Sequence, residues 1–392
     1  MTRTLQNRLK RQQAKRQALF IVLGTSLVVG VVIAVFALTA GHYPGNNGNA
    51  VSYTQTAGEV VEPSEMQYTD PLSSAAPPLS LGIGGDVTFG LAVADIVARE
   101  GPGYPWSDIA PLLGEYDITV ANLEGPLCRG TDPHPDQSSI YLRGEASCAT
   151  PMAGAGIDAV CLANDHIMDY GAAGLEETLS ILRNEKVGAF GAGSNSRAAE
   201  QPLVLEAANG ASVALLSFCD VAPAAYGSGE ETPGISAPSP EHLGEMVEQA
   251  ADKTPYVVVF MHWGEVGSSD ITPRQRELAQ VCVAAGADLV VGCHPHVLQG
   301  IEILQGVPVI YSLGNLVYSS ESEGGKSGIF AACRFSGGVL ANLQIIPLRV
   351  EGARPVALAG SEAENVLGQL GEASPGVQLD ISPATGTATL RL

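Results

Sequence analysis

The chain has 392 residues, 45% of them hydrophobic, which is enough to bury the core of one large domain or two ordinary ones. It carries 41 acidic residues against 20 lysines and arginines, a formal net charge of −21. Such a surface repels polyanions at long range, so the composition argues against nucleic-acid binding. An anionic substrate would need a local positive centre, which bound divalent cations can supply.

The N-terminal segment predicts a membrane anchor. Residues 1–17 hold six basic residues and no acidic residue, and residues 18–40 are 23 uncharged, mostly apolar residues. A run of this length can span a bilayer, and the basic flank predicts a cytoplasmic N-terminus with the rest of the chain extracellular. A cleavable signal peptide is the alternative, with Val35-Phe36-Ala37 as its cleavage site. We favour an uncleaved anchor because the apolar run is long for a signal peptide.

Residues 41–78 predict a flexible linker, since they are poor in large apolar residues and rich in Asn, Gly, Ser, Thr, Pro and Glu. After residue 79, short apolar runs typical of strands alternate with segments of helical spacing, which predicts an α/β domain with largely parallel sheets. We expect helices at 92–100, 174–185, 241–252 and 273–285, and strands at 79–85, 117–121, 158–163, 187–190, 212–218, 256–261, 288–293 and 307–312.

The last part of the chain predicts antiparallel pairing. Gly337-Gly338 separates two apolar runs and is a two-residue hairpin signal, so we expect a mixed sheet there. The domain is expected to span residues 79–350. Residues 351–392 are expected to be a C-terminal extension packed on it, with one short helix at 363–371. Residues 222–240, rich in Gly, Pro and Ser, predict a long surface loop.

Seven cysteines are an odd number for an exported protein. Cys128 and Cys148 flank a polar loop, and an extracellular location would allow a disulfide between them. The other five lie in or beside apolar runs and are expected to be buried thiols. Because the sequence contains no C-x-x-C, a cysteine-based metal cluster is not expected.

Two histidines, His294 and His296, follow the predicted strand at 288–293. In an extended segment, residues two apart point to the same side, so both are expected to face one point. Imidazole is the commonest metal ligand. The alternative is a solvated loop that happens to hold two histidines. Other polar residues also stand just past predicted strands, and these are Asp86, Asn122, Glu124, Asn164, Asp165, His166 and His262.

The carboxyl ends of parallel strands share one edge of a sheet, so these segments are expected to converge on one crevice. Their mixture of oxygen and imidazole donors suits Zn, Mn or Fe better than calcium, which prefers oxygen ligands alone. A carboxylate between two ions is the usual arrangement for activating water toward a phosphoester. We therefore predict a site for one or two divalent metal ions.

Six motifs in these segments resemble the CapA capsule-synthesis family, which is linked to poly-γ-glutamate and is similar in fold to calcineurin-like metallophosphatases. They run in order from about residue 79 to 348, and they read G-G-D-V-T-F-G, A-N-L-E-G-P-L, L-A-N-D-H-I-M-D-Y-G, M-H-W-G-E, G-C-H-P-H-V-L-Q-G and I-Y-S-L-G-N-L-V-Y. The resemblance implies two packed mixed β-sheets flanked by helices, a metallophosphatase-like sandwich, here preceded by one transmembrane helix.

The resemblance also implies roles for single residues. It implies that Asp86 and His296 bind a first metal, that Glu124 bridges, and that Asn164 or Asp165 binds a second metal. It places His262 and His294 on the second metal too, and Asn122 and Glu265 belong to the same motifs as candidate ligands. The position of His166 matches that of the residue that acts as an acid toward the leaving group in phosphatases. Arg143, in Y-L-R, matches an arginine that holds an anionic group.

The chain departs from the phosphatase pattern at two of these motifs. Thr88 stands where phosphatases have a histidine two residues after the first aspartate, which leaves the first metal a ligand short. Asp165 stands in N-D-H where the family usually has N-N-H. These departures bear on catalytic activity rather than on the fold.

Three functions follow as hypotheses. The first is a membrane-anchored, metal-binding CapA-type protein that assists synthesis, export or attachment of an anionic capsule polymer such as poly-γ-glutamate. Its partners would be the polymer or its carrier and other membrane capsule-synthesis proteins. The second is an extracellular metal-dependent phosphoesterase. The third is a non-catalytic module that binds polymer or partner proteins, and the many converging donor residues argue against it.

Overall fold

The computed structural model describes residues 76–130, 132–134 and 140–392. The predicted basic tail at 1–17, the anchor at 18–40 and nearly all of the linker at 41–78 lie outside the described residues. Within the described ranges, every helix is too short or too polar to cross a membrane. Residues 77–392 form one compact unit.

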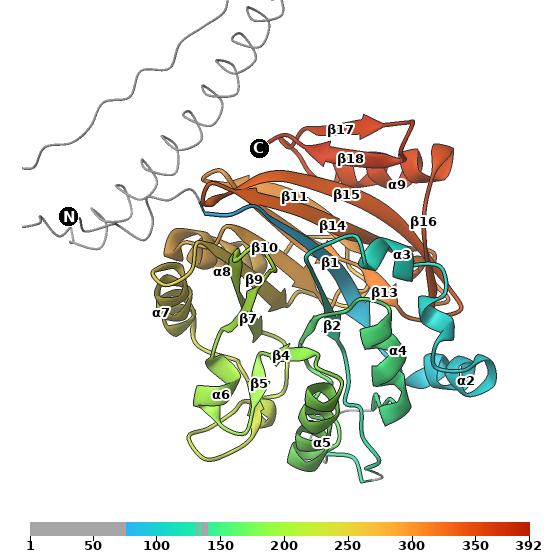
Figure 1. Ribbon diagram of the computed structural model, residues 1–392, viewed down its shortest axis with the longest axis vertical. Coiled ribbons are helices and arrows are strands. Elements are labelled where there is room, and N and C mark those ends of the chain that lie inside the picture. The colour runs from blue at the N-terminus through green and yellow to red at the C-terminus, as the bar shows by residue number, and fades with distance from the viewer. Residues whose placement is uncertain (1–75, 131, 135–139) are drawn as a thin grey trace, which may run out of the picture. The chain divides into compact units, whose positions relative to one another are not determined.

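The first of two large sheets has ten strands (Figure 1). β1, β2, β3 and β4 run parallel, whereas β14 pairs with β1 and with β15 in antiparallel fashion. In spatial order the strands are β17 (Leu379–Ser382), β18 (Thr387–Leu390), β15 (Val339–Glu351), β14 (Ser327–Ser336), β1 (Leu79–Val87), β2 (Ile118–Leu123), β3 (Ala159–Cys161) and β4 (Gly188–Phe190), with β13 (Asn315–Val317) beside β1 and β16 (Arg354–Ala357) beside β15.

The second sheet has six strands, and its four central ones run parallel. The two edge strands are antiparallel to their neighbours. In spatial order they are β11 (Leu298–Leu304), β12 (Val307–Leu313), β10 (Leu289–Cys293), β9 (Tyr256–His262), β7 (Ser212–Cys219) and β6 (Leu203–Glu206). A small ladder joins β5 (Ala192–Gly193) to β8 (Gly234–Ile235).

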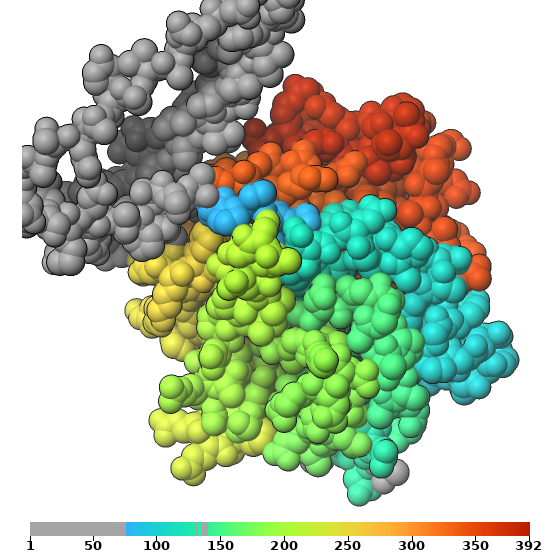
Figure 2. Space-filling model, viewed as in Figure 1, coloured from blue at the N-terminus to red at the C-terminus, as the bar shows by residue number. Residues whose placement is uncertain are grey.

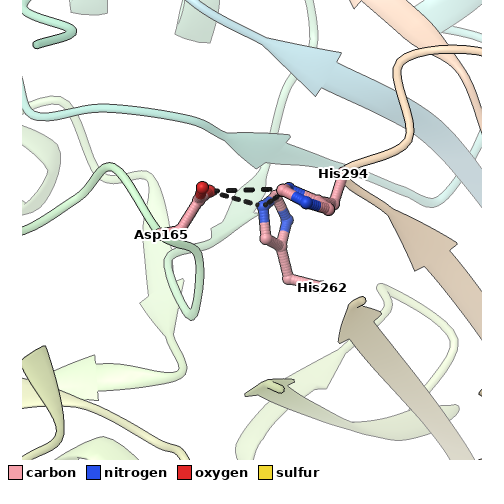
Figure 3. Close-up of side chains that lie close together, drawn as sticks. All are labelled: Asp165, His262 and His294. Carbon is pink, nitrogen blue, oxygen red and sulfur yellow. Dashed lines mark hydrogen bonds and ion pairs between the residues drawn. The ribbon is translucent and has the colours of Figure 1, made fainter. Parts of the chain in front are cut away.

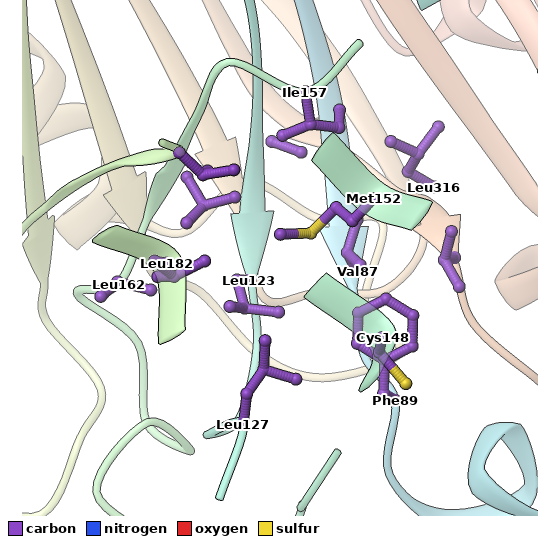
Figure 4. Close-up of a cluster of buried hydrophobic side chains, with 14 of the residues drawn as sticks. Val87, Phe89, Leu123, Leu127, Cys148, Met152, Ile157, Leu162, Leu182 and Leu316 are labelled. Carbon is purple, nitrogen blue, oxygen red and sulfur yellow. The ribbon is translucent and has the colours of Figure 1, made fainter. Parts of the chain in front are cut away.

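Helices cover one face of each sheet. Beside the first sheet lie α2 (Leu91–Glu100), α3 (Ala110–Leu113), α4 (Ala149–Gly154) and α5 (Gly171–Asn184), and beside the second lie α7 (Pro240–Ala251) and α8 (Pro273–Ala285). Figure 4 shows the core under the first group, where Met152 of α4 and Leu182 of α5 lie close to Leu123 of β2. The remaining helices are α6 (Ser196–Glu200) and α9 (Gly360–Glu372).

The other faces of the two sheets pack against each other, and β9 shows why. All seven of its residues are buried, and alternate side chains point to opposite faces. Val257 and Val259 pack with α7 and α8, whereas Phe260 meets Phe190 of β4 with ring centroids 5.4 Å apart. A strand covered on both faces is apolar throughout, as Y-V-V-V-F-M is.

The expected fold class, a mixed α/β domain with several sheets flanked by helices, is confirmed. Local sequence signals predicted where several helices and turns lie. Thr272 and Gln275 form a capping box at the start of α8, and Gly286 ends it in the left-handed region at φ 110°. Gly337 and Gly338 join β14 to β15 with φ of 60° and 78°, the positive angles that a two-residue hairpin turn requires.

Other expectations need correction. Residues 298–304 form β11, an edge strand that the sequence analysis did not anticipate after the histidine motif. The loop at 222–240 contains β8 and a short 3-10 turn with a buried Tyr226. All seven cysteines are free, buried thiols, so the Cys128–Cys148 disulfide is absent. Cys148 packs instead into the apolar core beside Phe89 (Figure 4).

Candidate metal centre

The strands of both sheets bring their carboxyl ends to one place. Asp86 of β1 pairs in register with Asn122 of β2 on one side and with Asn315 of β13 on the other. From the second sheet, His262 is the last residue of β9, and His294 directly follows β10. The predicted convergence of these segments is therefore present, and it draws on two sheets rather than one.

Asp165, His262 and His294 form the first ligand group (Figure 3). His262 Nε2 lies 2.9 Å from Asp165 Oδ1 and 3.1 Å from His294 Nδ1, and the third side of the triangle is 3.7 Å. Metal–ligand bonds of about 2.0–2.1 Å in a tetrahedral shell place neighbouring ligand atoms about 3.3 Å apart. The three atoms thus have the spacing of three ligands on one ion.

Asp86, Glu124 and His296 form the second group. His296 Nδ1 lies 3.4 Å from Asp86 Oδ2, and His296 Nε2 lies 3.3 Å from Glu124 Oε1. Glu124 is only 1% exposed, and neither of its carboxylate oxygens has a hydrogen-bond partner among the described residues. A buried carboxylate that makes an ion-pair contact but no hydrogen bond is costly. A cation would satisfy those oxygens, so these residues fit a metal ion.

Glu124 also forms a third group with Asp165 and His166, with ligand atoms within 4.8 Å of one another. It therefore stands between the first and second groups, the position that the family resemblance implies for a bridging carboxylate. Glu124 belongs to the second and third groups, and Asp165 belongs to the first and third, so the three groups are contiguous. The arrangement offers contiguous groups of candidate ligands for metal ions.

The two histidines of H-P-H do not face one point, contrary to the sequence-based expectation. His294 and His296 have φ of 97° and 56°, so the segment is not extended. Positive φ is strained for residues with a Cβ, and such residues cluster at functional sites. The local twist sends one ring to each ligand group, with 6.3 Å between the ring centroids.

Burial and neighbouring charges set the protonation of these groups. Burial raises the pKa of Asp86, but the hydrogen bond and charge of His296 outweigh it, and the pKa is lowered. Burial likewise opposes ionisation of Asp165, yet its hydrogen bonds to His262 and His294 hold its pKa well below the usual value. Both carboxylates are therefore anionic at neutral pH, as metal ligands must be.

Two asparagines expected among the ligands form hydrogen bonds within the site. Asn122 donates to Asp86 Oδ1 at 2.7 Å, and its carbonyl oxygen accepts from Asn164 at 3.2 Å. The Asn164 carbonyl oxygen accepts the backbone N–H groups of His166 and Ile167. These amides orient the carboxylate and the loop, and the neighbouring Asp165 lies in a group of possible ligands with His262 and His294.

His166 is held by a residue that the sequence analysis did not single out. Its Nδ1 lies 2.8 Å from Oδ2 of Asp169, which is fully buried and also accepts from the Leu142 N–H and the Tyr226 hydroxyl. Burial lowers the pKa of His166, but the Asp169 hydrogen bond and nearby carboxylates raise it to about 9. In the sequence, the signal for this pairing is the spacing of three residues between His166 and Asp169 in D-H-I-M-D.

Two of the predicted site residues, Arg143 and Glu265, lie apart from the ligand groups. The Arg143 guanidinium donates to the Gly130 carbonyl at 2.9 Å and pairs with Glu145 at 3.3 Å. The Glu265 side chain is exposed in the loop after β9. Thr88, at the position of the phosphatase histidine, is buried and accepts from the Gly90 N–H.

Asn315 and Tyr318 complete the surroundings of His296. Asn315 Oδ1 lies 3.0 Å from His296 Nδ1, and the Tyr318 ring stacks on the imidazole with centroids 4.5 Å apart. Both belong to the motif I-Y-S-L-G-N-L-V-Y, and the sequence analysis assigned neither of them to the site. Contacts of this kind, made to a histidine ligand by residues that do not themselves bind the metal, fix the orientation of its ring.

The fold and site together define a mixed α/β protein whose two sheets converge on a candidate metal centre. Residues 80–320 match the family described as bacterial capsule synthesis protein PGA_cap, and the chain belongs to that family. It is 30% identical over 293 residues to the capsule biosynthesis protein CapA of Bacillus anthracis, covering 73% of this chain and 71% of the relative. It is 27% identical over 299 residues to the PGA biosynthesis protein CapA of Bacillus subtilis, covering 76% and 77%.

The calcineurin-like phosphoesterase YfkN of Bacillus subtilis is 13% identical, with a TM-score of 0.34 over 72% of this chain and 88% of the other. The NAD nucleotidase of Haemophilus influenzae is 15% identical, with a TM-score of 0.41 over 76% of this chain and 56% of the other.

Proposed function

We propose that this protein is a membrane-anchored, extracellular CapA-type protein that assists the synthesis, export or attachment of an anionic capsule polymer such as poly-γ-glutamate. The observation that carries the proposal is the family match over residues 80–320, which contain every candidate ligand. Relatives named for capsule and PGA biosynthesis support the same polymer class. The partners would be the polymer or its carrier and other membrane capsule-synthesis proteins.

The proposed centre holds one or two ions of Mn, Fe or Zn. Asp165, His262 and His294 would hold one ion, and Asp86 and His296 the other, with Glu124 between them. A bound ion supplies positive charge that polarises a phosphoryl or carbonyl oxygen, and in this acidic protein it also attracts an anionic chain. Mixed oxygen and imidazole donors favour these metals over calcium.

The residues around the centre then have distinct tasks. Asn122 and Asn164 fix the carboxylates and the loop, as their hydrogen bonds indicate. Asp169 holds His166 through its Nδ1, so Nε2 would be the ring atom that gives a proton to a departing oxygen or nitrogen. The distance of 3.7 Å between His166 Nε2 and Asp165 Oδ2 places that atom beside a ligand group.

An extracellular phosphoesterase is the second candidate, and the His166–Asp169 pair favours it because a positioned acid is what a leaving alkoxide needs. Thr88 weighs against it, since the first ion lacks the histidine that phosphatases supply at this position. Weak phosphatase activity at most is therefore expected. Fast turnover of an aryl phosphate with Mn²⁺, abolished by His166→Ala, would favour the phosphoesterase over the proposed role.

The proposal is tested by deleting the gene in its host and measuring surface-bound polymer, hydrolysed and quantified as glutamate. Loss on deletion, rescue by the wild-type gene and no rescue by His294→Ala are expected. His242→Ala, which changes a half-exposed histidine outside the ligand groups, is the matched control and should rescue fully. Unchanged polymer after deletion, or full rescue by His294→Ala, would contradict the proposal.

A further inference from the structure

Two buried glutamines join the start of α8 to the strand that follows the H-P-H turn. Gln275 and Gln299 are both 0% exposed, and Nε2 of Gln275 donates to Oε1 of Gln299 at 2.7 Å. Oε1 of Gln275 accepts the Thr272 N–H at 2.9 Å, within the capping box. Gln299 is the glutamine of the motif G-C-H-P-H-V-L-Q-G, and the sequence analysis assigned it no role. Because a buried amide is costly unless it is paired, these contacts fix the orientation of both side chains.

The Gln299 amide holds the loop between β9 and α8. Its Nε2 donates to the carbonyl oxygens of Ser268 and Asp270, at 3.0 Å each. An amide nitrogen carries two hydrogens, so both donors of this group are used. Most residues of the loop from 264 to 270 are exposed. The buried amide therefore gives a largely solvent-exposed loop a fixed attachment to the protein interior.

The same loop holds the middle of the H-P-H turn. The Gly267 N–H donates to the Pro295 carbonyl at 2.8 Å. Pro295 stands between His294 and His296, whose φ angles of 97° and 56° are uncommon for residues with a Cβ. Backbone strain of this kind persists only where surrounding contacts hold it. The two glutamines thus act on both histidines through one loop and one hydrogen bond.

The ends of the turn are held from the first sheet. The His294 N–H donates to Asp86 Oδ2 at 3.3 Å, and Nδ2 of Asn315 donates to the His296 carbonyl at 3.2 Å. The Pro295 carbonyl lies between these two points, and its hydrogen bond comes from the loop after β9. The turn is therefore fixed at its ends by one sheet and in its middle by the loop that the glutamines hold.

Gln299 itself stands on a strand that is held on both sides. β11 pairs with β12 along one edge, and on the other side the Ile301 N–H donates to the Ser374 hydroxyl at 2.8 Å. Ser374 belongs to the C-terminal extension, which Figure 2 shows in red, lying over the orange strands of the first sheet. The amide of Gln299 thus reaches the loop from a fixed base.

We propose that Gln275 and Gln299 are positioning residues of the metal centre, and that they set the H-P-H turn so that His294 and His296 reach different ligand groups. The inference rests on the proposed metal centre and extends it to two residues that bind no ion. Because His294 belongs to the first group and His296 to the second, a loosened turn should weaken both groups together.

The test is isothermal titration calorimetry of the metal-free, full-length chain in detergent micelles with Zn²⁺, comparing the wild type with Gln299→Met. Methionine is close to glutamine in length but donates no hydrogen bond, so the Ser268 and Asp270 carbonyls lose their partner. Losing a contact that orients ligands costs ~10–100-fold in metal affinity, so the Kd should rise at least about tenfold. The visible absorption of bound Co²⁺, which reports the arrangement of its ligands, should also change.

Gln344→Met is the matched control. Gln344 donates to the Thr387 hydroxyl at 2.8 Å, between β15 and β18, two strands that carry no candidate ligand. The same substitution there removes a side-chain hydrogen bond, so the Tm should fall while the Zn²⁺ Kd and the Co²⁺ spectrum keep their wild-type values. An unchanged Kd and spectrum in Gln299→Met, or equal changes in both variants, would overturn the positioning role and leave the proposed function standing.

Hydrogen–deuterium exchange of the wild type decides the question if Gln299→Met does not fold. Coupling between two sites is reciprocal, so a loop that positions the ligands must itself be protected when they hold an ion. Exchange at residues 264–270 should slow when Zn²⁺ is added, and unchanged exchange there would overturn the inference. A wild type that binds neither Zn²⁺ nor Co²⁺ would overturn it together with the proposed centre, and the surface-polymer assay then decides separately on the function.

Discussion

Metal binding should stabilise the fold, and Glu124→Gln should abolish much of that gain. Glutamine keeps the volume of the side chain but removes the negative charge whose two oxygens lack hydrogen-bond partners among the described residues. Without metal, the variant also loses the contact of Glu124 with His296 at 3.3 Å, so it should unfold near the wild-type temperature. With metal, the wild type gains a ligand interaction that the variant has largely lost.

The expected size follows from the extent of the folded unit. An ion at 100 times its Kd stabilises the native state by about 2.7 kcal/mol. The unit Pro77–Leu392 has about 300 residues, and an unfolding entropy of about 2.1 cal/mol/K per residue gives about 0.6 kcal/mol/K. The wild-type Tm should rise by about 4 °C.

The assay is differential scanning calorimetry of the full-length chain, first with EDTA and then with Mn²⁺ or Zn²⁺ in excess. Glu176→Gln, an exposed acid on α5, is the control and should show the full wild-type shift. A wild-type Tm that does not respond to any of these metals would refute the reasoning. An equal shift in the wild type and in Glu124→Gln would show that the ion binds elsewhere.

Three further outcomes are expected. Protease added to intact protoplasts should remove the folded domain and leave a small N-terminal fragment containing residues 18–40, and full protection would disprove the proposed topology. Thr272→Ala should destabilise the chain by about 1 kcal/mol in urea unfolding, because it removes the capping box of α8, and an unchanged midpoint would contradict this. Glu200 and Glu245 raise the pKa of His242 by hydrogen bonding, so its pairs stabilise the fold below the ordinary histidine pKa of about 6.5, and the gain is lost as pH rises through the raised value. His242→Ala should accordingly cost more stability at pH 5.5 than at pH 9, and equal costs at the two pH values would count against the ion pairs.

The sequence by itself determined the elements whose causes are local. The capping box at Thr272 and the glycines at 337 and 338 act over a few residues, so their signals can be identified without any partner. The uninterrupted apolar run of β9 also indicates a strand that is buried on both faces. Because parallel strands share an edge, the polar residues that follow them could be placed together, and most of the candidate ligands were found in this way.

Only the tertiary structure decided which side chains meet. The contact of Asp165 with His262 joins segments far apart in sequence, and the pairing of Asp169 with His166 and of Arg143 with Glu145 depends on side-chain rotamers. The positive φ of His294 likewise arises from contacts made on folding, and it sends the ring to a different group from that of His296. A pattern of residues along the chain carries no record of these distances, because packing between distant elements sets them.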